Sequence, residues 1–280
     1  MSRPSGRGRR LPLLSLASML CAGALVLCAP ALASTPVPGG EPAMGSQSEP
    51  VTDTPMGSQI RKHEGGEERA VPVVDPLATV AGMDVSGHQG NVNWQSWWDQ
   101  GMRFAYVKAT ESTGYTNPYF AQQYNGSYNI GMIRGAYHFA LPDRSSGAAQ
   151  ANYFVDNGGG WSKDGKTLPG ALDMEYNPYG ETCYGLSKSQ MTSWIKDFSD
   201  TYQSRTGRYP VIYTSNSWWS QCVDGDFSST NPLWVASYSS TVGQLPHAWQ
   251  IWTIWQYTSD PIDKNTFNGA MDRLQALANG

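Results

Sequence analysis

The chain has 280 residues, of which 40% are hydrophobic and 12% aromatic, with 11 Trp, 15 Tyr and a formal net charge of −4. This length allows one large α/β domain, or two small ones, with a sizeable core. The acidic balance excludes the basic surface that nucleic-acid binding requires, so no nucleic-acid partner is expected. Aromatic-rich soluble domains often bind sugars, although most of these rings are expected to pack in the core.

The first 33 residues have the features of an export signal. A basic region is followed by an apolar run over 11–27 and by a small-residue cleavage site at 31–33. A retained membrane anchor is the weaker alternative, because the apolar run is short for a stable span. Without residues 1–33 the chain has 15 basic and 23 acidic residues, a net charge of −8. We therefore expect a secreted, extracellular protein with no membrane partner after signal cleavage.

The cysteines indicate a disulfide rather than a metal site. Cys21 and Cys28 leave with the signal, while Cys183 and Cys222 remain as an even pair in an exported protein, which predicts one disulfide. No Cys-x-x-Cys or His-Glu-x-x-His run occurs, and the four His are scattered. The sequence therefore predicts no metal and no cofactor.

Composition divides the remaining chain in two. Residues 34–76 are rich in Pro, Gly, Ser, Thr and Glu, which predicts a disordered linker or a propeptide. Residues 77–280 are expected to form one β/α barrel domain, because strand-like and helix-like patterns alternate there. The strands are expected at 79–85, 104–110, 133–140, 170–176, 210–214, 233–238 and 251–257. The helices are expected at 94–98, 119–129, 146–156, 187–205 and 269–278.

The last part of the chain departs from this alternation. Little between the last two strands looks helical, and Asp263 follows in a loop. The pattern predicts an α/β fold of the TIM-like type, a modified and irregular barrel of about eight strands with helices missing in its last part.

Two acids stand out on the fourth predicted strand. Asp173 and Glu175 lie in a short apolar run between Gly170 and Pro178. Side chains two apart on a strand point the same way, so the two carboxyls would share a face. Each opposes ionisation of the other, which favours one proton being retained near neutral pH, as a general acid requires. An exposed edge strand with two solvated acids is the alternative.

Other polar residues should converge on the same rim, because sites in parallel barrels are built where the strands end. The residues at or just past predicted strand ends include Asp84, Glu111, His138, Trp234, Tyr238, Gln256 and Asp263. No nucleophile elbow, phosphate loop or dinucleotide fingerprint is present. Paired carboxylates with aromatic residues and no cofactor signature indicate glycoside hydrolysis.

Seven motifs carry a family resemblance. They are Gly82-Met-Asp-Val-Ser-Gly-His-Gln-Gly90, Phe104-Ala-Tyr-Val-Lys-Ala-Thr-Glu111, Arg134-Gly-Ala-Tyr-His-Phe139, Leu172-Asp-Met-Glu175, Val211-Ile-Tyr-Thr214, Trp234-Val-Ala-Ser-Tyr238 and Ile254-Trp-Gln-Tyr257. In this order they resemble family 25 of the glycoside hydrolases, the Chalaropsis-type lysozymes, and most closely its secreted actinomycete N-acetylmuramidases. The resemblance covers about residues 79–280.

The resemblance implies hydrolysis of the β-1,4 bond between N-acetylmuramic acid and N-acetylglucosamine in peptidoglycan, by a monomer acting on glycan strands. It implies a barrel of five regular βα units and three further strands. Glu175 would be the general acid, and Asp173 would hold the sugar's N-acetyl group or stabilise its positive charge. The expected substrate-binding residues are Asp84, Glu111, Tyr137, Gln256 and Asp263. The pair Cys183 and Cys222 also matches a cysteine pair of close relatives.

The chain departs from the family at Glu111-Ser112, where Glu-Gly is common, and at Ser237-Tyr238, where Trp-Gly or a similar pair is common. Two rival functions stay open: a non-catalytic peptidoglycan-binding module on the same barrel, and a chitinase-like enzyme. The latter's Asp-x-x-Asp-x-Asp-x-Glu run is absent, because Ala171, two residues before Asp173, is not an acid. Retention or inversion at the sugar carbon also stays open.

Overall fold

The computed structural model describes residues 50–67, 69–75 and 78–280, which belong to one compact unit of the chain. The predicted export signal at 1–33 and the first part of the predicted linker lie outside the described residues. Within the described ranges, every helix is too short or too polar to cross a membrane.

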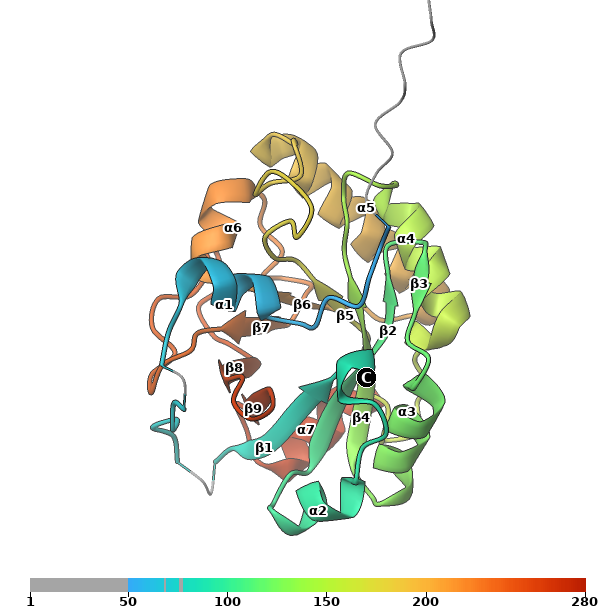
Figure 1. The fold of residues 1–280 in the computed structure, drawn as a ribbon, viewed down its shortest axis with the longest axis vertical. Helices are drawn as coiled ribbons and strands as arrows, with labels where there is room; N and C mark the ends of the chain where they lie inside the picture. The colour runs from blue at the N-terminus through green and yellow to red at the C-terminus, as the bar shows by residue number, and fades with distance from the viewer. Residues whose placement is uncertain (1–49, 68, 76–77) are drawn as a thin grey trace, which may run out of the picture. The chain divides into compact units, whose positions relative to one another are not determined.

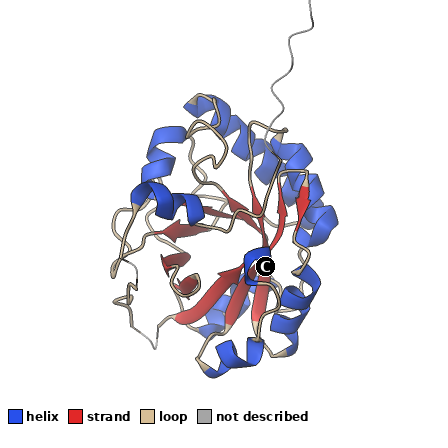
Figure 2. Cartoon of the chain, viewed as in Figure 1, coloured by secondary structure: helices blue, strands red, loops and turns tan. Residues whose placement is uncertain are grey.

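Nine strands form a single sheet that closes into a barrel (Figures 1 and 2). The strands are β1 Val80–Val85, β2 Phe104–Glu111, β3 Tyr115–Thr116, β4 Ile133–Phe139, β5 Ala171–Asp173, β6 Val211–Thr214, β7 Leu233–Ala236, β8 Ile254–Thr258 and β9 Lys264–Phe267. Their order is β1-β9-β8-β7-β6-β5-β4-β2-β3, and β1 also pairs with β2. Eight strands therefore close the barrel, and β3 lies outside it.

Seven of the barrel strands run in the same direction. Neighbouring strands are parallel from β1 through β2, β4, β5, β6 and β7 to β8, while β9 is antiparallel to both β8 and β1. The carboxyl ends of seven strands thus meet at one rim, where barrel sites are built. The predicted irregular TIM-like barrel is confirmed.

Helices cover the outside of the barrel in its first part (Figure 2). In chain order, the helices of the described residues are α1 Ser58–Glu64, α2 Trp94–Asp99, α3 Phe120–Asn129, α4 Gly147–Phe154, α5 Lys188–Thr206, α6 Asn216–Cys222 and α7 Met271–Asn279. Ser187 begins α5 with a capping box, in which its hydroxyl accepts from the N–H of Gln190. Between β7 and β9 the described chain forms no helix, as the sequence predicted.

The structure corrects several sequence expectations. Helix α6 and strand β9 were not predicted, because each is short and neither has a clear apolar period. Strand β5 ends at Asp173, so Glu175 lies past the strand and not on a common strand face with Asp173. Helix α1 falls inside the range predicted to be disordered. The prediction of disorder is therefore wrong for this helix. The boundary between a linker or propeptide at 34–76 and a barrel domain at 77–280 stays a prediction.

Large aromatic side chains fill the barrel, which is a packed core and not a pore. Tyr106 on β2 and Tyr213 on β6 both pack on Trp234 of β7, with ring centroids 4.7 and 5.3 Å apart. All three side chains are fully buried. This core holds the strand ends in place and so fixes the positions of the polar residues at the rim.

The predicted disulfide is confirmed between Cys183, in the loop after β5, and Cys222, at the end of α6. It closes a loop with a sequence separation of 39 residues. A cross-link over a loop of this length stabilises a fold by about 3–4 kcal/mol in the chain-entropy view.

We expect the double substitution Cys183→Ala and Cys222→Ala to lower the free energy of unfolding by about 3–4 kcal/mol. Urea unfolding followed by tryptophan fluorescence measures this change, and reduced wild-type protein is the matched control. A double variant that unfolds at the midpoint of oxidised wild type would contradict the expectation.

Candidate active site

Four buried carboxyls gather at the rim formed by the strand ends. Asp84 lies near the end of β1, Asp173 is the last residue of β5, Glu175 follows two residues later, and Asp263 directly precedes β9. The charges of Asp84 and Glu175 both act on Asp263, and those of Asp84 and Glu175 also act on Asp173. The rim therefore brings together four of the five acids that the sequence singled out, and Glu111, the fifth, ends β2 at the same rim.

Asp84 is held by two amide groups. Its Oδ2 accepts hydrogen bonds from Gln256 Nε2 at 2.9 Å and from Asn265 Nδ2 at 2.7 Å. Its Oδ1 has no donor among the described residues. Burial raises the pKa of Asp84 to about 7, although both amides oppose this rise. The group is thus poised between its neutral and ionised forms near neutral pH.

Asp173 is the one carboxyl of the four whose two oxygens are both buried without a hydrogen bond to the described residues. It is fully buried, and neither oxygen lies within hydrogen-bond distance of a donor among the described residues. Burial, followed by the charge of Glu175, raises the pKa of Asp173 well above its usual range, while Lys108 opposes the rise. A buried polar group without a partner destabilises the fold, so Asp173 is not explained by a structural role.

Glu175 is also fully buried, but both of its oxygens are engaged. Oε1 accepts from the N–H of Gly57 at 2.7 Å, and Oε2 accepts from the N–H groups of Gln59 at 2.8 Å and Ile60 at 2.9 Å. Burial raises the pKa of Glu175 to about 8, against the lowering effect of these three hydrogen bonds. A carboxyl with such a pKa can retain a proton at neutral pH, as a general acid must.

Asp263 completes the group of four carboxyls. Burial, followed by the charges of Asp84 and Glu175, raises its pKa well above the usual range. Its backbone carbonyl accepts from the N–H of Asp84 at 3.2 Å, which ties the end of β1 to the start of β9. Four acids in mutual range cannot all ionise together, so the rim can store a proton for transfer.

Glu111 takes part in a buried ion pair. Its Oε2 lies 2.6 Å from Lys108 Nζ, and both side chains are fully buried. In a regular strand, residues three apart point to opposite faces. The register of β2 against β4 shifts between Lys108 and Thr110, and this irregularity brings the two side chains together. Glu111 thus lies at the rim and in a salt bridge at once.

Gln256 and Tyr137 line the same region. Oε1 of Gln256 accepts from the hydroxyls of Tyr213 at 2.6 Å and Tyr238 at 2.8 Å. Its Nε2 donates to Asp84, so this side chain is fixed at both ends. The Tyr137 hydroxyl accepts from the N–H of Met56 at 3.2 Å. Hydroxyls and amides aimed at a common space are the groups that recognise the polar face of a sugar.

Three polar residues at this site were not predicted from the sequence. Lys108 contacts Glu111, Tyr213 contacts Gln256, and Asn265 contacts Asp84. A signal existed for Lys108, since a lysine inside the apolar run of β2 needs a buried partner. Asn265 lies on β9, a strand that was itself not predicted, and Tyr213 carries no pattern that separates it from a core residue.

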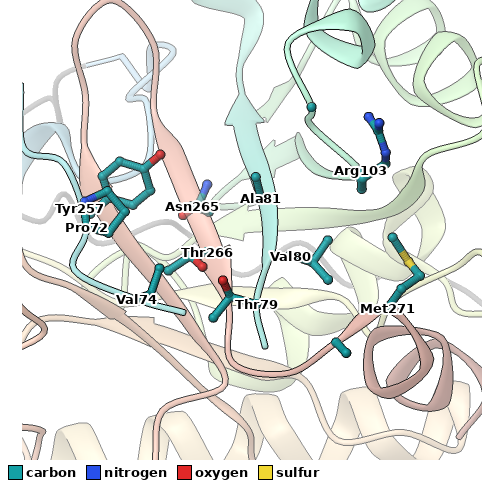
Figure 3. Close-up of a pocket in the computed structure, with 12 residues that line it drawn as sticks. Pro72, Val74, Thr79, Val80, Ala81, Arg103, Tyr257, Asn265, Thr266 and Met271 are labelled. Carbon is teal, nitrogen blue, oxygen red and sulfur yellow. The ribbon is translucent and has the colours of Figure 1, made fainter. Parts of the chain in front are cut away.

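The cavity in Figure 3 lies away from these acids. It has a volume of about 420 Å³ and lies at the starts of the parallel strands, beside Thr79, Val80, Arg103 and Met271. None of its lining residues is acidic. Another cavity, of about 280 Å³, lies between α1, the start of α6 and the chain after β7, where Ile60, Glu64 and Tyr238 line it. None of the four rim acids lines either cavity.

His138, which stands at a strand end, belongs to the core and not to the rim chemistry. Its Nδ1 lies 2.7 Å from Thr110 Oγ1 and its Nε2 lies 2.9 Å from Gln150 Oε1. Burial lowers the pKa of His138 to about 3. The folded protein therefore binds this proton only at low pH, whereas an unfolded chain binds it below pH ~6.5.

We expect His138 to reduce stability as the pH falls from about 6.5 to about 3. At pH 7 the wild type should be more stable than His138→Gln, which loses part of the hydrogen bonding. Below pH ~6.5 the difference in free energy of unfolding between wild type and His138→Gln should shrink by at most about 1.4 kcal/mol per pH unit. The reason is that only the unfolded wild type binds the extra proton. Urea unfolding at pH 7, 5.5 and 4.5 measures this difference, and a constant difference would contradict the assignment.

No cluster of three or more His, Cys, Asp or Glu side chains within 50–67, 69–75 and 78–280 has the arrangement of a metal site. The rim presents carboxyls, amides and hydroxyls. A buried acid with a raised pKa, a second acid nearby and a polar rim can together protonate a leaving oxygen and stabilise the positive charge that follows.

Comparisons with known proteins define the class. The family model described as glycosyl hydrolases family 25 matches residues 83–266. Lysozyme M1 of Streptomyces globisporus is 43% identical over 293 residues, covering 98% of this chain and 96% of the relative. The N,O-diacetylmuramidase of Chalaropsis sp is 49% identical over 212 residues, covering 72% of this chain and all of the relative.

A solved structure agrees with these sequence matches. The muramidase from Acremonium alcalophilum superposes with a TM-score of 0.71 at 54% identity, covering 72% of this chain and 99% of that one. The chain belongs to glycosyl hydrolase family 25 and is a glycoside hydrolase of the lysozyme, or muramidase, class.

Proposed function

We propose that this enzyme hydrolyses the β-1,4 bond from N-acetylmuramic acid to N-acetylglucosamine in bacterial peptidoglycan, with Glu175 as the general acid. The observation that carries the proposal is the position of Glu175 at the barrel mouth, in one group with the carboxyls of Asp84, Asp173 and Asp263. The relatives named lysozyme and N,O-diacetylmuramidase support the choice of substrate.

Glu175 gives its proton to the oxygen that leaves. As this proton moves to the glycosidic oxygen, the bond from that oxygen to the sugar's anomeric carbon breaks. The leaving sugar departs with a hydroxyl, and Glu175 becomes a carboxylate. Positioned acid catalysis of this kind contributes about 10²–10⁴-fold in rate.

Asp173 meets the positive charge that develops on the anomeric carbon. In one route it accepts a hydrogen bond from the substrate's acetamido N–H, so that the acetamido oxygen bonds to that carbon. Water then displaces this oxygen from the carbon and gives its proton to the carboxylate of Glu175. In the other route water attacks directly, with inversion, and a carboxylate at the rim takes its proton. Both routes need an acid beside Glu175, and Asp173 has no structural partner that would compete for its oxygens.

The remaining rim residues bind the glycan. We assign substrate contacts to Asp84, Glu111, Tyr137, Gln256 and Asp263, which present carboxyl, hydroxyl and amide groups along one side of the barrel. The partner is the peptidoglycan strand, and the protein works as a monomer outside the cell after loss of residues 1–33. Neither nucleic acid nor membrane takes part.

Release of reducing ends from peptidoglycan and from chitin tests this function. We expect release from purified sacculi and little from chitin, which lacks the lactyl ether of muramic acid. The assay uses the chain both intact and after cleavage between 65 and 78, because residues 57–60 cover Glu175 in the intact chain. Binding to sacculi without reducing ends in either form would favour the non-catalytic wall-binding module, and preferential release from chitin would favour a chitinase.

A further inference from the structure

A segment N-terminal to the barrel lies across the acid rim. Residues 53–64 comprise an extended stretch followed by α1, and α1 lies beside α6 (Figure 1). Glu64 accepts hydrogen bonds there from the hydroxyls of Ser215, which caps α6, and Tyr176. This stretch, which we call the blocking segment, belongs to the predicted linker, and residues on both sides of it also contact the barrel, as the N–H groups of Thr52 and Glu67 do at Tyr179 and Tyr238.

The blocking segment contacts most of the residues to which we assign catalysis or substrate binding. Three of its backbone N–H groups saturate both oxygens of Glu175. The N–H of Met56 donates to the hydroxyl of Tyr137, and the hydroxyl of Tyr238 lies 3.0 Å from the carbonyl of Gly57. These are the hydrogen bonds that a bound sugar would otherwise make.

The extended part of the blocking segment is held at Glu111. Thr54 donates to this carboxylate from its N–H at 2.9 Å and from its hydroxyl at 3.0 Å. The carbonyl of Thr54 accepts from Lys108 Nζ at 2.6 Å, and Asp53 lies 3.1 Å from the same ammonium group. The buried ion pair of the barrel thus extends to the segment and fixes its direction.

Apolar side chains of the segment are buried at the barrel mouth. Met56 and Ile60 are each only 1% exposed and belong to the same core cluster as the barrel aromatics. Beneath them Glu175 has no exposed surface. A general acid must touch the leaving oxygen, so no glycan can react while the segment is in place.

We propose that residues 53–64 are an intramolecular inhibitor and that the intact chain is a latent precursor, which becomes active when the chain is cut between 65 and 78. This inference rests on the function proposed above. Cutting removes the covalent link that keeps the segment at high effective concentration beside the cleft, so it leaves at dilute enzyme concentrations.

The chain between the segment and the barrel is suited to cleavage. Val71 and Val73 are 75% and 76% exposed, and the region precedes β1, so a cut there breaks no barrel strand. Exposed connecting chain is where proteases act. The barrel also suffices in relatives, since the family model begins at residue 83 and the whole Chalaropsis enzyme matches only 72% of this chain.

The first experiment cuts the protein at a chosen place. A recognition sequence for a site-specific protease is inserted after Val71 in the full chain, and reducing-end release from sacculi is measured before and after cutting. We expect cutting to raise activity at least ten-fold. Equal activity in both forms would overturn the inhibitor while leaving the hydrolase standing. Absence of activity in both forms would overturn the hydrolase and the inhibitor with it.

The second experiment loosens the segment without cutting it. A Cβ at Gly57, where φ is +77°, would lie 2.1 Å from the Tyr238 hydroxyl oxygen and 2.5 Å from Gln256 Oε1. Gly207, which ends α5, has nearly the same backbone, with φ +78° and ψ +3° against +77° and −7° at Gly57, but nothing lies within 4 Å of its Cβ position. Gly57→Ala and Gly207→Ala are thus a matched pair with similar backbone strain, and only the first clashes with the rim.

We expect uncut Gly57→Ala to release reducing ends at least ten-fold faster than uncut Gly207→Ala, and the two to be equal once cut. Both changes lie outside the barrel strands, so neither alters the catalytic groups. A synthetic peptide of residues 50–67 should inhibit the cut enzyme, and the same peptide with Gly57→Ala should not. Equal latency of the two uncut variants would overturn the proposal.

Discussion

Glu175→Gln should lower the rate of reducing-end release by about 10²–10⁴-fold in the cut chain. Gln has nearly the same shape but no acidic proton, so the leaving oxygen would depart unprotonated. The fold should persist, because Glu175 follows β5 and lies outside the barrel strands. Initial rates on sacculi and thermal unfolding are measured on the same preparation.

The matched control for this change is Glu181→Gln, an exposed acid in the same loop. It should retain the wild-type rate. An active Glu175→Gln enzyme, with a rate within about two-fold of the control, would remove Glu175 from the role of acid.

The same variant has a second consequence in the intact chain. An amide nitrogen would replace one acceptor of the three N–H groups, so the blocking segment should bind less tightly.

Asp173→Asn should lower the turnover number by about 10²–10³-fold and yet stabilise the intact fold. The rate, measured on the cut chain, falls because a neutral amide cannot balance the positive charge on the sugar. Stability of the intact chain rises because burial forces the wild-type carboxyl to take up a proton on folding, whereas the amide is neutral in both states. A residue with a purely structural role would give the opposite result for stability.

The stabilisation by Asp173→Asn should depend on pH in a defined direction. The pKa of Asp173 in the fold is raised well above its unfolded value of about 3.9, so the folded state binds more protons than the unfolded state above that pH. Wild type therefore loses stability as the pH rises from about 4, and the variant does not. The gain should be about 0.5–2 kcal/mol at pH 7 and vanish near pH 4.

Urea unfolding of the intact chain at pH 7 and pH 4 measures this effect, and Asp272→Asn, exposed on α7, is the control. We expect the control to leave both the rate and the stability unchanged. A destabilised Asp173→Asn variant at pH 7 would show that the carboxyl has a structural partner, and would contradict the role assigned to it.

The barrel could be predicted because its strands combine apolar runs with turn residues. The regular βα units, the late loss of helices and the positions of Asp84 and Asp263 all follow from local pattern and from the rule that strand ends share a rim. Helix α6 and strand β9 could not be predicted in this way. Each is a few residues long, and tertiary packing rather than a local period determines its conformation.

The sequence prediction differed most from the structure at the blocking segment, which was expected to be disordered. Its composition is typical of disordered chain, and only two apolar residues, Met56 and Ile60, hold it on the barrel. They stand four apart, which is the spacing of one helix face, but a single pair does not separate a helix from a linker. The hydrogen bonds to Glu175 come from backbone N–H groups, which any sequence possesses, so no residue type could reveal them.

The pairing of Asp173 and Glu175 was correctly expected, but for an incomplete reason. The prediction placed both on one strand face, whereas β5 ends at Asp173 and the chain has left the strand at Glu175. The two acids are neighbours because they are two residues apart in the chain, whereas closure of the sheet brings Asp84, near the end of β1, to the same rim. That convergence depends on closure, which a local pattern does not contain.

The sugar that carries the new reducing end is the most direct test of the whole account. Sacculi are digested with the cut chain, and the released muropeptides are reduced and identified by mass spectrometry. We predict that the reduced sugar is N-acetylmuramic acid in the wild-type digest and that Glu175→Gln yields almost none of it. Reduced N-acetylglucosamine in its place, or no new reducing end at all, would contradict the assignment.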